Sequence, residues 1–274
     1  MNLIYADMHN HTTFSDGQLS PEQVLTRLKK LGAKACAISD HDTVDALPEA
    51  VETAKALGIL FVPAIEISTY ASKDVHILGY GIDYRSEEFL DTLNTVKEYR
   101  KARNIRLYEK LQSMGIKIDL DPAAKGVGRV HFALAMVKAG YCQNIGEAFD
   151  RYLGTGKPAY IQATKLTPLA AVKAIVSAGG IPCLAHPKAY LTDKSAELLI
   201  SGLVKYGLKA LEVSYPAHNE TEEKTLRALA SKYRLIPTAG SDFHYESSDG
   251  YNASFVPKME EADVLKLLHG NKTK

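Results

Sequence analysis

Imidazole and carboxylate side chains recur along the sequence at positions that could bind metal ions. Most of them directly follow a short apolar run that is typical of a β-strand. The candidate ligands are His9, His11, Asp16, His41, Glu66, His76, His186, Asp242 and His244. These six imidazoles and three carboxylates exceed the about four to six ligands that one ion takes. We therefore expect two or three divalent metal ions in one site.

Two pairs of these residues are separated by a single intervening residue. His9 and His11 form the first pair, and Asp242 and His244 form the second. In an extended strand, side chains two positions apart leave the same face, so each pair can reach one ion. Asp16 follows the first pair in a turn that contains a glycine, and such a turn lets the carboxylate point back toward the strand end.

Three further candidates lie in or beside apolar runs. His41 stands between Asp40 and Asp42, two carboxylates that could orient its ring. Glu66 follows the end of an apolar strand and is flanked by isoleucines, so its charge needs a partner, and we expect it to bridge two ions. His76 begins another apolar run, where a packed, hydrogen-bonded histidine is as good an interpretation as a metal ligand.

The ligand types indicate both the metal and the reaction. Mixed imidazole and carboxylate ligation without cysteine suits Mn²⁺, Fe²⁺ or Zn²⁺ better than Mg²⁺ or Ca²⁺, which prefer oxygen ligands. Clustered divalent ions lower the pKa of a shared water molecule and neutralise negative charge on phosphoryl oxygens. Hydrolysis of a phosphate ester needs these effects most, and we predict in-line attack by a hydroxide that bridges the ions.

Charge and composition restrict the substrate and the compartment. A net charge of +1 and a pI near 7.7 argue against tight binding of long nucleic acid but allow a small anionic substrate. No apolar stretch approaches the roughly 20 residues that span a bilayer, and the N-terminus leads directly into candidate ligands, so we expect a cytoplasmic protein without membrane contact. Cys36, Cys142 and Cys183 are interpreted as reduced core residues.

Short apolar runs alternate with longer helical patterns along most of the chain. The expected strands are Leu3–Ala6, Ala35–Ile38, Leu60–Ile65, Val75–Tyr80, Ile181–Ala185, Ala210–Val213 and Ile236–Ala239. The expected helices are Pro21–Leu31, Leu47–Leu57, Ser86–Met114, Pro168–Ser177, Ala196–Tyr206 and Glu220–Tyr233. This alternation predicts parallel βα units of the α/β class, arranged as a barrel or a distorted barrel, with an open doubly wound sheet as the alternative.

The rhythm breaks between about residues 116 and 159, where glycine-rich turns separate two short helical patterns. We interpret this stretch as an insertion. The predicted organisation is a first barrel segment over residues 1–99, a small helical subdomain over 100–160 and a second barrel segment over 161–274.

The motifs D-x-H-x-H with S-D-G, S-D-H-D-T, A-H-P and G-S-D-F-H, with Glu66 and His76 between them, resemble the PHP (polymerase and histidinol phosphatase) superfamily of metal-dependent phosphoesterases. The resemblance covers almost the whole chain. It implies a distorted (β/α)₇ barrel with a trinuclear site at the C-terminal ends of the strands. Of the possible divalent ions, we expect Mn²⁺. The implied ligand sets are His9, His11, Glu66 and Asp242 for one ion, Glu66, His76 and His186 for a second, and Asp16, His41 and His244 for a third. Asp16, His41, Glu66 and His244 are the expected catalytic residues.

The insertion is similar to that of the subgroup that dephosphorylates 3′,5′-nucleotide bisphosphates or trims the 5′ ends of short oligonucleotides. A second phosphate could be clamped there by basic side chains. The candidates are Arg100, Arg103, Arg129, His131 and Lys157, with His218 as a further candidate for a substrate contact. The chain departs from the subgroup at Val130, where a proline is usual, and at Lys188-Ala189, where an arginine often stands second after A-H-P. These departures bear on substrate choice and leave the ligands unchanged.

Three alternatives remain open at this stage. The first is a monophosphate phosphatase that acts on a small metabolite such as histidinol phosphate. The second is a non-catalytic module that metal ions only stabilise, although no candidate ligand position is occupied by an apolar residue. The third is metal-dependent amidohydrolysis, for which the expected lysine near a strand end is not evident.

Overall fold

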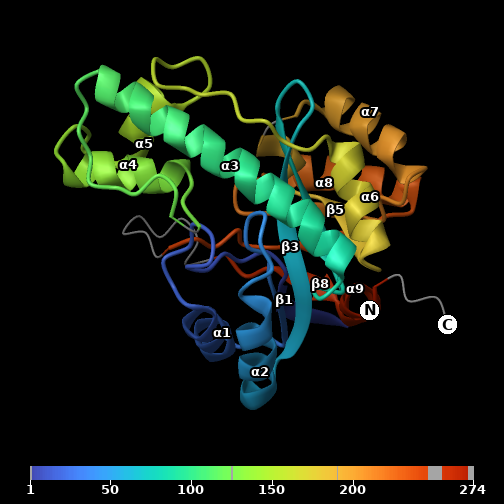
Figure 1. Cartoon of the computed structure of the whole chain (residues 1–274). Helices are drawn as coiled ribbons and strands as arrows, with labels where there is room; N and C mark the ends of the chain where they lie inside the picture. Colours follow the sequence, from blue (N-terminus) through green and yellow to red (C-terminus); the bar gives the residue numbers. More distant parts are fainter. Residues whose placement is uncertain (1, 125, 190, 246–254, 271–274) are drawn as a thin grey trace. The chain divides into compact units, whose positions relative to one another are not determined.

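The computed structural model describes residues 2–124, 126–189, 191–245 and 255–270. The chain divides into two compact units, a barrel unit of residues 1–93 and 166–274, and a second unit of residues 94–165 (Figure 1). The insertion expected over residues 100–160 falls inside the second unit. That this segment is an independently inserted subdomain stays a prediction.

The barrel unit is built on a sheet whose described strands run in the order β7-β6-β5-β4-β3-β2-β1-β8. The strands are β1 (Leu3–Asp7), β2 (Ala35–Ile38), β3 (Leu60–Tyr70), β4 (Asp74–Tyr80), β5 (Ile181–Leu184), β6 (Ala210–Ser214), β7 (Ile236–Ala239) and β8 (Lys258–Glu260). Beyond β1, the amide of Met8 donates a hydrogen bond to the carbonyl of Ala239 (3.0 Å), and Asn10 forms a parallel bridge with Phe243. These contacts bring β7 to β1 and nearly close the sheet, which confirms the predicted distorted α/β barrel.

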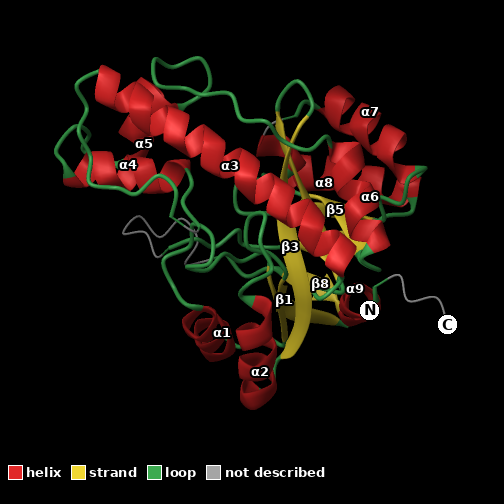
Figure 2. Ribbon diagram, viewed as in Figure 1, coloured by secondary structure: helices red, strands yellow, loops and turns green. Residues whose placement is uncertain are grey.

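Helices pack around the outside of this sheet, namely α1 (Pro21–Lys30), α2 (Leu47–Leu57), α6 (Pro168–Ser177), α7 (Asp193–Val204) and α8 (Glu220–Tyr233) (Figure 2). A further helix, α9 (Glu261–His269), instead packs Val264 and Leu267 into the apolar cluster inside the barrel. Alternation along β2 separates two cores, because Ala35 and Ala37 belong to the apolar cluster inside the barrel while Cys36 and Ile38 join the cluster under the helices. Small side chains on the inner face leave room for a closed barrel.

The parallel pattern predicted from the sequence is wrong at β4, which runs antiparallel to both β3 and β5. A tight turn at residues 71–73, with Ser72 at φ 61°, reverses the chain between β3 and β4. The prediction that Glu66 ends its strand is also wrong, because β3 continues to Tyr70 in this hairpin. The reversal brings the beginning of β4, which carries His76, to the end of the barrel where the parallel strands finish. The elements β8 and α9 were not predicted.

The second unit has a core of its own. It contains most of α3 (Glu87–Ser113), together with α4 (Arg129–Lys138), α5 (Ile145–Ala148) and a π-helical turn, Phe149–Leu153. Leu107, Leu111, Phe132 and Met136 are fully or almost fully buried in this cluster. In neither unit does a described helix combine the length and the apolar character needed to cross a membrane.

Candidate metal centre

The structure gathers all nine predicted ligands in the barrel unit. Eight of them form three overlapping groups, within each of which the donor atoms lie within 4.8 Å of one another. The groups are His11, Asp16, His41 and His244; His9, His11, Glu66 and Asp242; and His41, Glu66 and His76. The ninth, His186, contacts Glu66. Segments from both ends of the sequence therefore converge on one cluster.

Glu66 lies at the centre of the cluster, and its side chain has no solvent exposure. Its Oε1 lies 2.9 Å from His76 Nδ1 and 2.9 Å from His186 Nε2. Its Oε2 lies 3.0 Å from His41 Nδ1 and 3.3 Å from His11 Nε2. The two carboxylate oxygens thus face different histidines, which is the geometry of a bridging ligand.

Asp242 is the second carboxylate of the group that also contains His9, His11 and Glu66. Its Oδ1 lies 3.3 Å from His9 Nε2 and 3.1 Å from His11 Nε2. The hydroxyl of Tyr215 donates a hydrogen bond to Oδ2 (3.1 Å), and the Tyr215 ring lies 5.3 Å from that of His186. Tyr215 therefore orients Asp242, a role that nothing in its local sequence pattern indicates.

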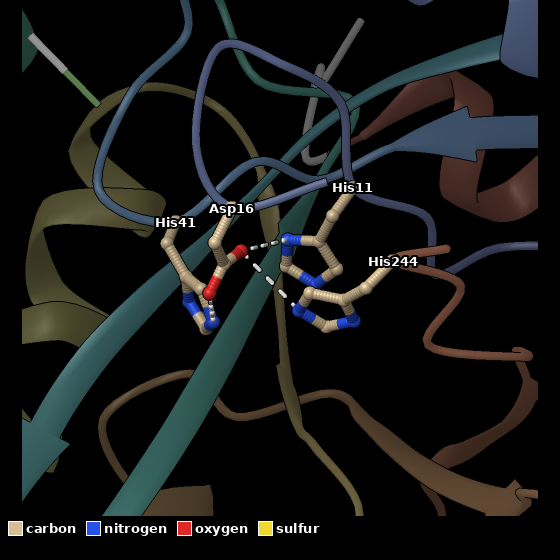
Figure 3. Close-up of side chains that lie close together, drawn as sticks. All are labelled: His11, Asp16, His41 and His244. Carbon is tan, nitrogen blue, oxygen red and sulfur yellow. Dashed lines mark ion pairs between the residues drawn. The ribbon is translucent and has the colours of Figure 1, made fainter. Parts of the chain in front are cut away.

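Asp16 is the centre of the third group (Figure 3). Its Oδ1 lies 3.2 Å from His244 Nε2 and 3.7 Å from His11 Nδ1, and its Oδ2 lies 3.8 Å from His41 Nε2. The rings of His11 and His244 stack with their centroids 4.1 Å apart. A single carboxylate is thus surrounded by three imidazoles from three segments.

Several buried atoms in the cluster face one another without forming a hydrogen bond to any described residue. They are Nε2 of His9 and His11, Nδ1 of His41, Oδ1 of Asp16 and Oε2 of Glu66. Ligand atoms that each lie about 2.1 Å from one ion are separated from each other by about 3.0–3.4 Å in tetrahedral or octahedral geometry. The nitrogens of His41, His11 and His9 lie 3.0, 3.3 and 3.4 Å from Glu66 Oε2, so these spacings suit atoms that share an ion.

Burial and mutual electrostatics set the protonation of the cluster. Burial would raise the pKa of Glu66, but the neighbouring imidazoles, with His41 and His76 foremost, hold it well below its usual value. The pKa of Asp16 is likewise lowered, against the effect of burial, by His41 and His244. Burial lowers the pKa of His41 to about 3 in spite of the carboxylates beside it. These carboxylates stay ionised and His41 stays neutral, the states in which they bind metal ions.

Acidic residues around the cluster hold its loops. Asp40 accepts hydrogen bonds from the amide and hydroxyl of Thr12 (2.8 and 2.7 Å) and from the hydroxyl of Ser15 (2.5 Å), so it fixes the loop that carries Asp16. The amide of Ser68 donates to Asp42 (2.8 Å). The predicted orientation of the His41 ring is therefore not the task of Asp40, which holds the neighbouring loop instead.

Two other buried acids, Asp7 and Glu212, were not among the candidate site residues predicted from the sequence. Asp7 accepts a hydrogen bond from the amide of Ser241 (2.9 Å), and burial raises the pKa of its carboxyl to about 6. Glu212 lies within β6 and contacts His9. The signal for Glu212 was available, because it stands between Leu211 and Val213 just as Glu66 stands between two isoleucines.

The predicted substrate contacts lie mostly in the second unit. Arg100 Nη1 lies 3.3 Å from the place that a β-carbon on Gly128 would take, at the start of α4. The amide of Gly128 donates to Nδ1 of His131 (3.1 Å), so the neutral ring carries its proton on Nε2. The guanidinium of Arg129 lies 5.8 Å from the ring of Phe149. Three of the predicted basic residues thus lie around the first turn of α4.

The other predicted contacts differ in exposure. Arg103 is only 7% exposed, whereas Lys157 is exposed. His218 belongs to the barrel unit, where it is buried, donates from Nδ1 to the carbonyl of Val213 (2.9 Å) and packs its ring 5.0 Å from that of Tyr215. Lys188, which directly follows A-H-P, forms an ion pair with Asp193.

A nearly closed α/β barrel with clustered imidazoles and carboxylates at one end defines a metal-binding hydrolase. The chain belongs to the PHP family, because the PHP domain matches residues 7–155. It is 35% identical to a 5′-3′ exoribonuclease of Haemophilus influenzae, over 87% of this chain and 89% of that protein. It is 31% identical to a 3′,5′-nucleoside bisphosphate phosphatase of Chromobacterium violaceum, over 89% and 88%.

The fold agrees with this family. A solved structure from Bifidobacterium adolescentis, assigned as a metal-dependent phosphoesterase, matches with a TM-score of 0.84 and 27% identity over 96% of this chain and 95% of that chain. The chain is a metal-dependent phosphoesterase of the PHP type. The hypothesis of a non-catalytic module is therefore set aside.

Proposed function

We propose that this enzyme removes a phosphate from a nucleotide that carries two phosphates, or from the 5′ end of a short oligonucleotide, with three divalent ions. Mn²⁺ is the expected ion, with Fe²⁺ and Zn²⁺ as alternatives. The proposed ligand sets are His9, His11, Glu66 and Asp242; Glu66, His76 and His186; and Asp16, His41 and His244. Asp16, His41, Glu66 and His244 are the proposed catalytic residues.

The observation that carries this proposal is the position of Glu66. Its Oε1 faces His76 and His186 while its Oε2 faces His41 and His11, all at 2.9 to 3.3 Å. A buried carboxylate shared in this way supports two adjacent ions, and the group around Asp16 supplies donors for a third. Bound there, divalent ions would lower the pKa of a water molecule and neutralise charge on the reacting phosphate.

The second unit supports the choice of a substrate with two phosphates. The side chains of Arg100, Arg129 and His131 lie around the start of α4. Unpaired amides at the start of a helix and guanidinium groups both favour a phosphate, and Arg can bind it through two parallel hydrogen bonds. We propose that these residues, with Arg103 and Lys157, bind the phosphate that is not cleaved, and that His218 contributes a contact from the barrel unit.

A comparison of substrates tests the proposal. Purified enzyme with Mn²⁺ should release phosphate from 3′-phosphoadenosine 5′-phosphate and from short 5′-phosphorylated oligonucleotides faster than from adenosine 5′-monophosphate or histidinol phosphate. Equal kcat/KM for the bisphosphate and the two monophosphates would contradict the assignment of the second unit. Preference for histidinol phosphate would favour the small-metabolite alternative.

We also propose that the enzyme works in the cytoplasm on small substrates. The three cysteines are buried and form no disulfide, which suits a reducing compartment. The net charge of +1 provides little attraction for a long polyanion.

A further inference from the structure

Glu212 is the most deeply buried acid that the proposed ligand sets leave out. Its side chain has no solvent exposure and projects from β6. Its Oε1 lies 3.0 Å from His9 Nδ1, and its Oε2 accepts a hydrogen bond from the backbone amide of His186 (2.7 Å). One carboxylate thus connects two histidines that are far apart in the sequence and that belong to different proposed ligand sets.

The contact with Glu212 decides which nitrogen of His9 is available. A carboxylate oxygen accepts hydrogen bonds, so Nδ1 of His9 carries a proton and donates a hydrogen bond to Oε1 of Glu212. In the neutral form of the ring, which is the form that binds a metal ion, the lone pair then lies on Nε2. Nε2 faces Glu66 Oε2 (3.4 Å) and Asp242 Oδ1 (3.3 Å). Without an acceptor at Nδ1 the proton could move to Nε2, where it would block a metal ion.

The second contact holds a strained backbone. His186 has a φ of 22°, a value that residues with a side chain rarely adopt. The hydrogen bond from its amide to Glu212 fixes this conformation, and in it Nε2 of the ring lies 2.9 Å from Glu66 Oε1. Loss of the acceptor would leave a buried amide unpaired and would let the segment after β5 relax.

Gly240 provides independent support. A β-carbon at this position would collide with the β-carbon of His9 and would lie 2.8 Å from Glu212 Oε1. The side chains of His9 and Glu212 therefore occupy the space in which a side chain at position 240 would lie. Glycine, which has no side chain, fits at this position. The contact between His9 and Glu212 is consequently built into the packing.

We propose that Glu212 is a positioning residue that orients His9 and His186 for metal binding, and that it couples the first two ion positions. This inference rests on the proposed function, because it takes His9 and His186 to be ligands. Partners of this kind behind metal-binding histidines typically contribute about 10–100-fold to metal affinity.

The test is the metal content of Glu212→Gln, measured by equilibrium dialysis against limiting Mn²⁺ and elemental analysis. A glutamine has one oxygen, so it can satisfy either His9 or His186 but presents an amide donor to the other. We expect affinity at two of the three positions to fall about 10–100-fold, while the position around Asp16 keeps its ion. Gly240→Ala should weaken the same two positions without a change of charge, and Glu22→Gln, at an exposed position of α1, should change nothing.

Wild-type affinity at all three positions in folded Glu212→Gln would overturn the inference and leave the proposed function intact. Failure of the wild-type protein to bind ions would instead contradict the proposed function. If Glu212→Gln does not fold, NMR of ¹⁵N-histidine-labelled wild-type protein loaded with Zn²⁺ decides, with His9 assigned from the spectrum of His9→Gln. A proton on Nδ1 and a metal-shifted Nε2 are expected, and the reverse would overturn the inference.

Discussion

The metal-ligand cluster of the barrel unit and the basic residues of the 94–165 unit differ in how they are held. In the barrel unit, Glu66 and His9 are fully buried, and Oε2 of Glu66 lies 3.4 Å from Nε2 of His9. In the 94–165 unit, the basic side chains lie on helices and turns and differ in exposure, since Lys157 is exposed whereas Arg103 is only 7% exposed. The barrel thus holds its ligands in one buried cluster, whereas the charges of the second unit range from buried to solvent-exposed.

The difference in burial suggests that turnover depends on the barrel and that substrate preference depends on the second unit. Charges in a buried cluster act at low dielectric and cannot be replaced without leaving a neighbour unpaired. Exposed cations act through screened interactions that depend on geometry and salt. We therefore expect substitutions in the barrel to abolish turnover, and those in the second unit to change which phosphate ester is preferred.

The largest effect is expected for Glu66→Gln. Glutamine removes the negative charge that two proposed ions share, so kcat/KM should fall by about 10³-fold or more, which corresponds to several kcal/mol of lost transition-state stabilisation. Steady-state kinetics and elemental analysis of the same preparation would check this. Glu22→Gln, an identical chemical change at an exposed position, is the control. Near-normal turnover in Glu66→Gln would remove the basis for a bridging carboxylate.

A substitution in the core of the second unit should destabilise that unit without changing metal binding in the barrel. Phe132 is fully buried in α4, and Phe132→Ala should destabilise that unit by about 3–5 kcal/mol. Hydrogen exchange measured by mass spectrometry should accelerate over residues 94–165 while the barrel keeps its metal ions. Ile105→Ala, at a position that is 37% exposed, should have little effect. Parallel loss of metal from Phe132→Ala would show that the two regions are not separable.

Removal of metal ions should affect only the barrel. An ion present at 100 times its dissociation constant stabilises the folded state by about 2.7 kcal/mol. Chelation should therefore lower the unfolding temperature and accelerate exchange in the loops after β1 and β7, which carry His11 and Asp242. Residues 94–165 should exchange at an unchanged rate, and faster exchange there would contradict the comparison.

The smallest effect is expected for Arg129→Ala. Loss of a charge-assisted hydrogen bond, about 1.5 kcal/mol, should raise KM for a nucleotide bisphosphate by about 10-fold. KM for the corresponding monophosphate should not change. Arg106→Ala, at an exposed position of α3, is the control. Equal changes for both substrates would indicate that Arg129 acts on stability and not on the second phosphate.

The sequence predicted the strands well, and the candidate ligands come together in one cluster where side-chain type and strand pattern coincide. His41, His186 and Asp242 stand at or just beyond the ends of apolar runs, and the chemistry of each residue type limits its role. The reversal of β4 could not be predicted, because its turn at Ser72 adopts a positive φ without glycine or proline to mark it. Its consequence is that His76 joins the cluster from the start of a strand.

Contacts between residues that are far apart in the sequence were harder to predict from the sequence. Tyr215 reaches Asp242 across 27 positions of sequence, and nothing in its local pattern indicates a partner. Glu212 did carry a signal, a charge within the apolar run of β6, but its two partners become apparent only when β1 and β5 are placed beside it. Burial of a charge predicts that a partner exists and leaves the identity of the partner to the fold.

The most direct test of the central claim is an anomalous difference map from crystals of the wild-type protein grown with Mn²⁺. We expect three peaks, one between Glu66 and Asp242 beside His9, one between Glu66 and the pair His76 and His186, and one beside Asp16. A single peak, or peaks away from Glu66, would contradict a three-ion centre organised by one buried carboxylate.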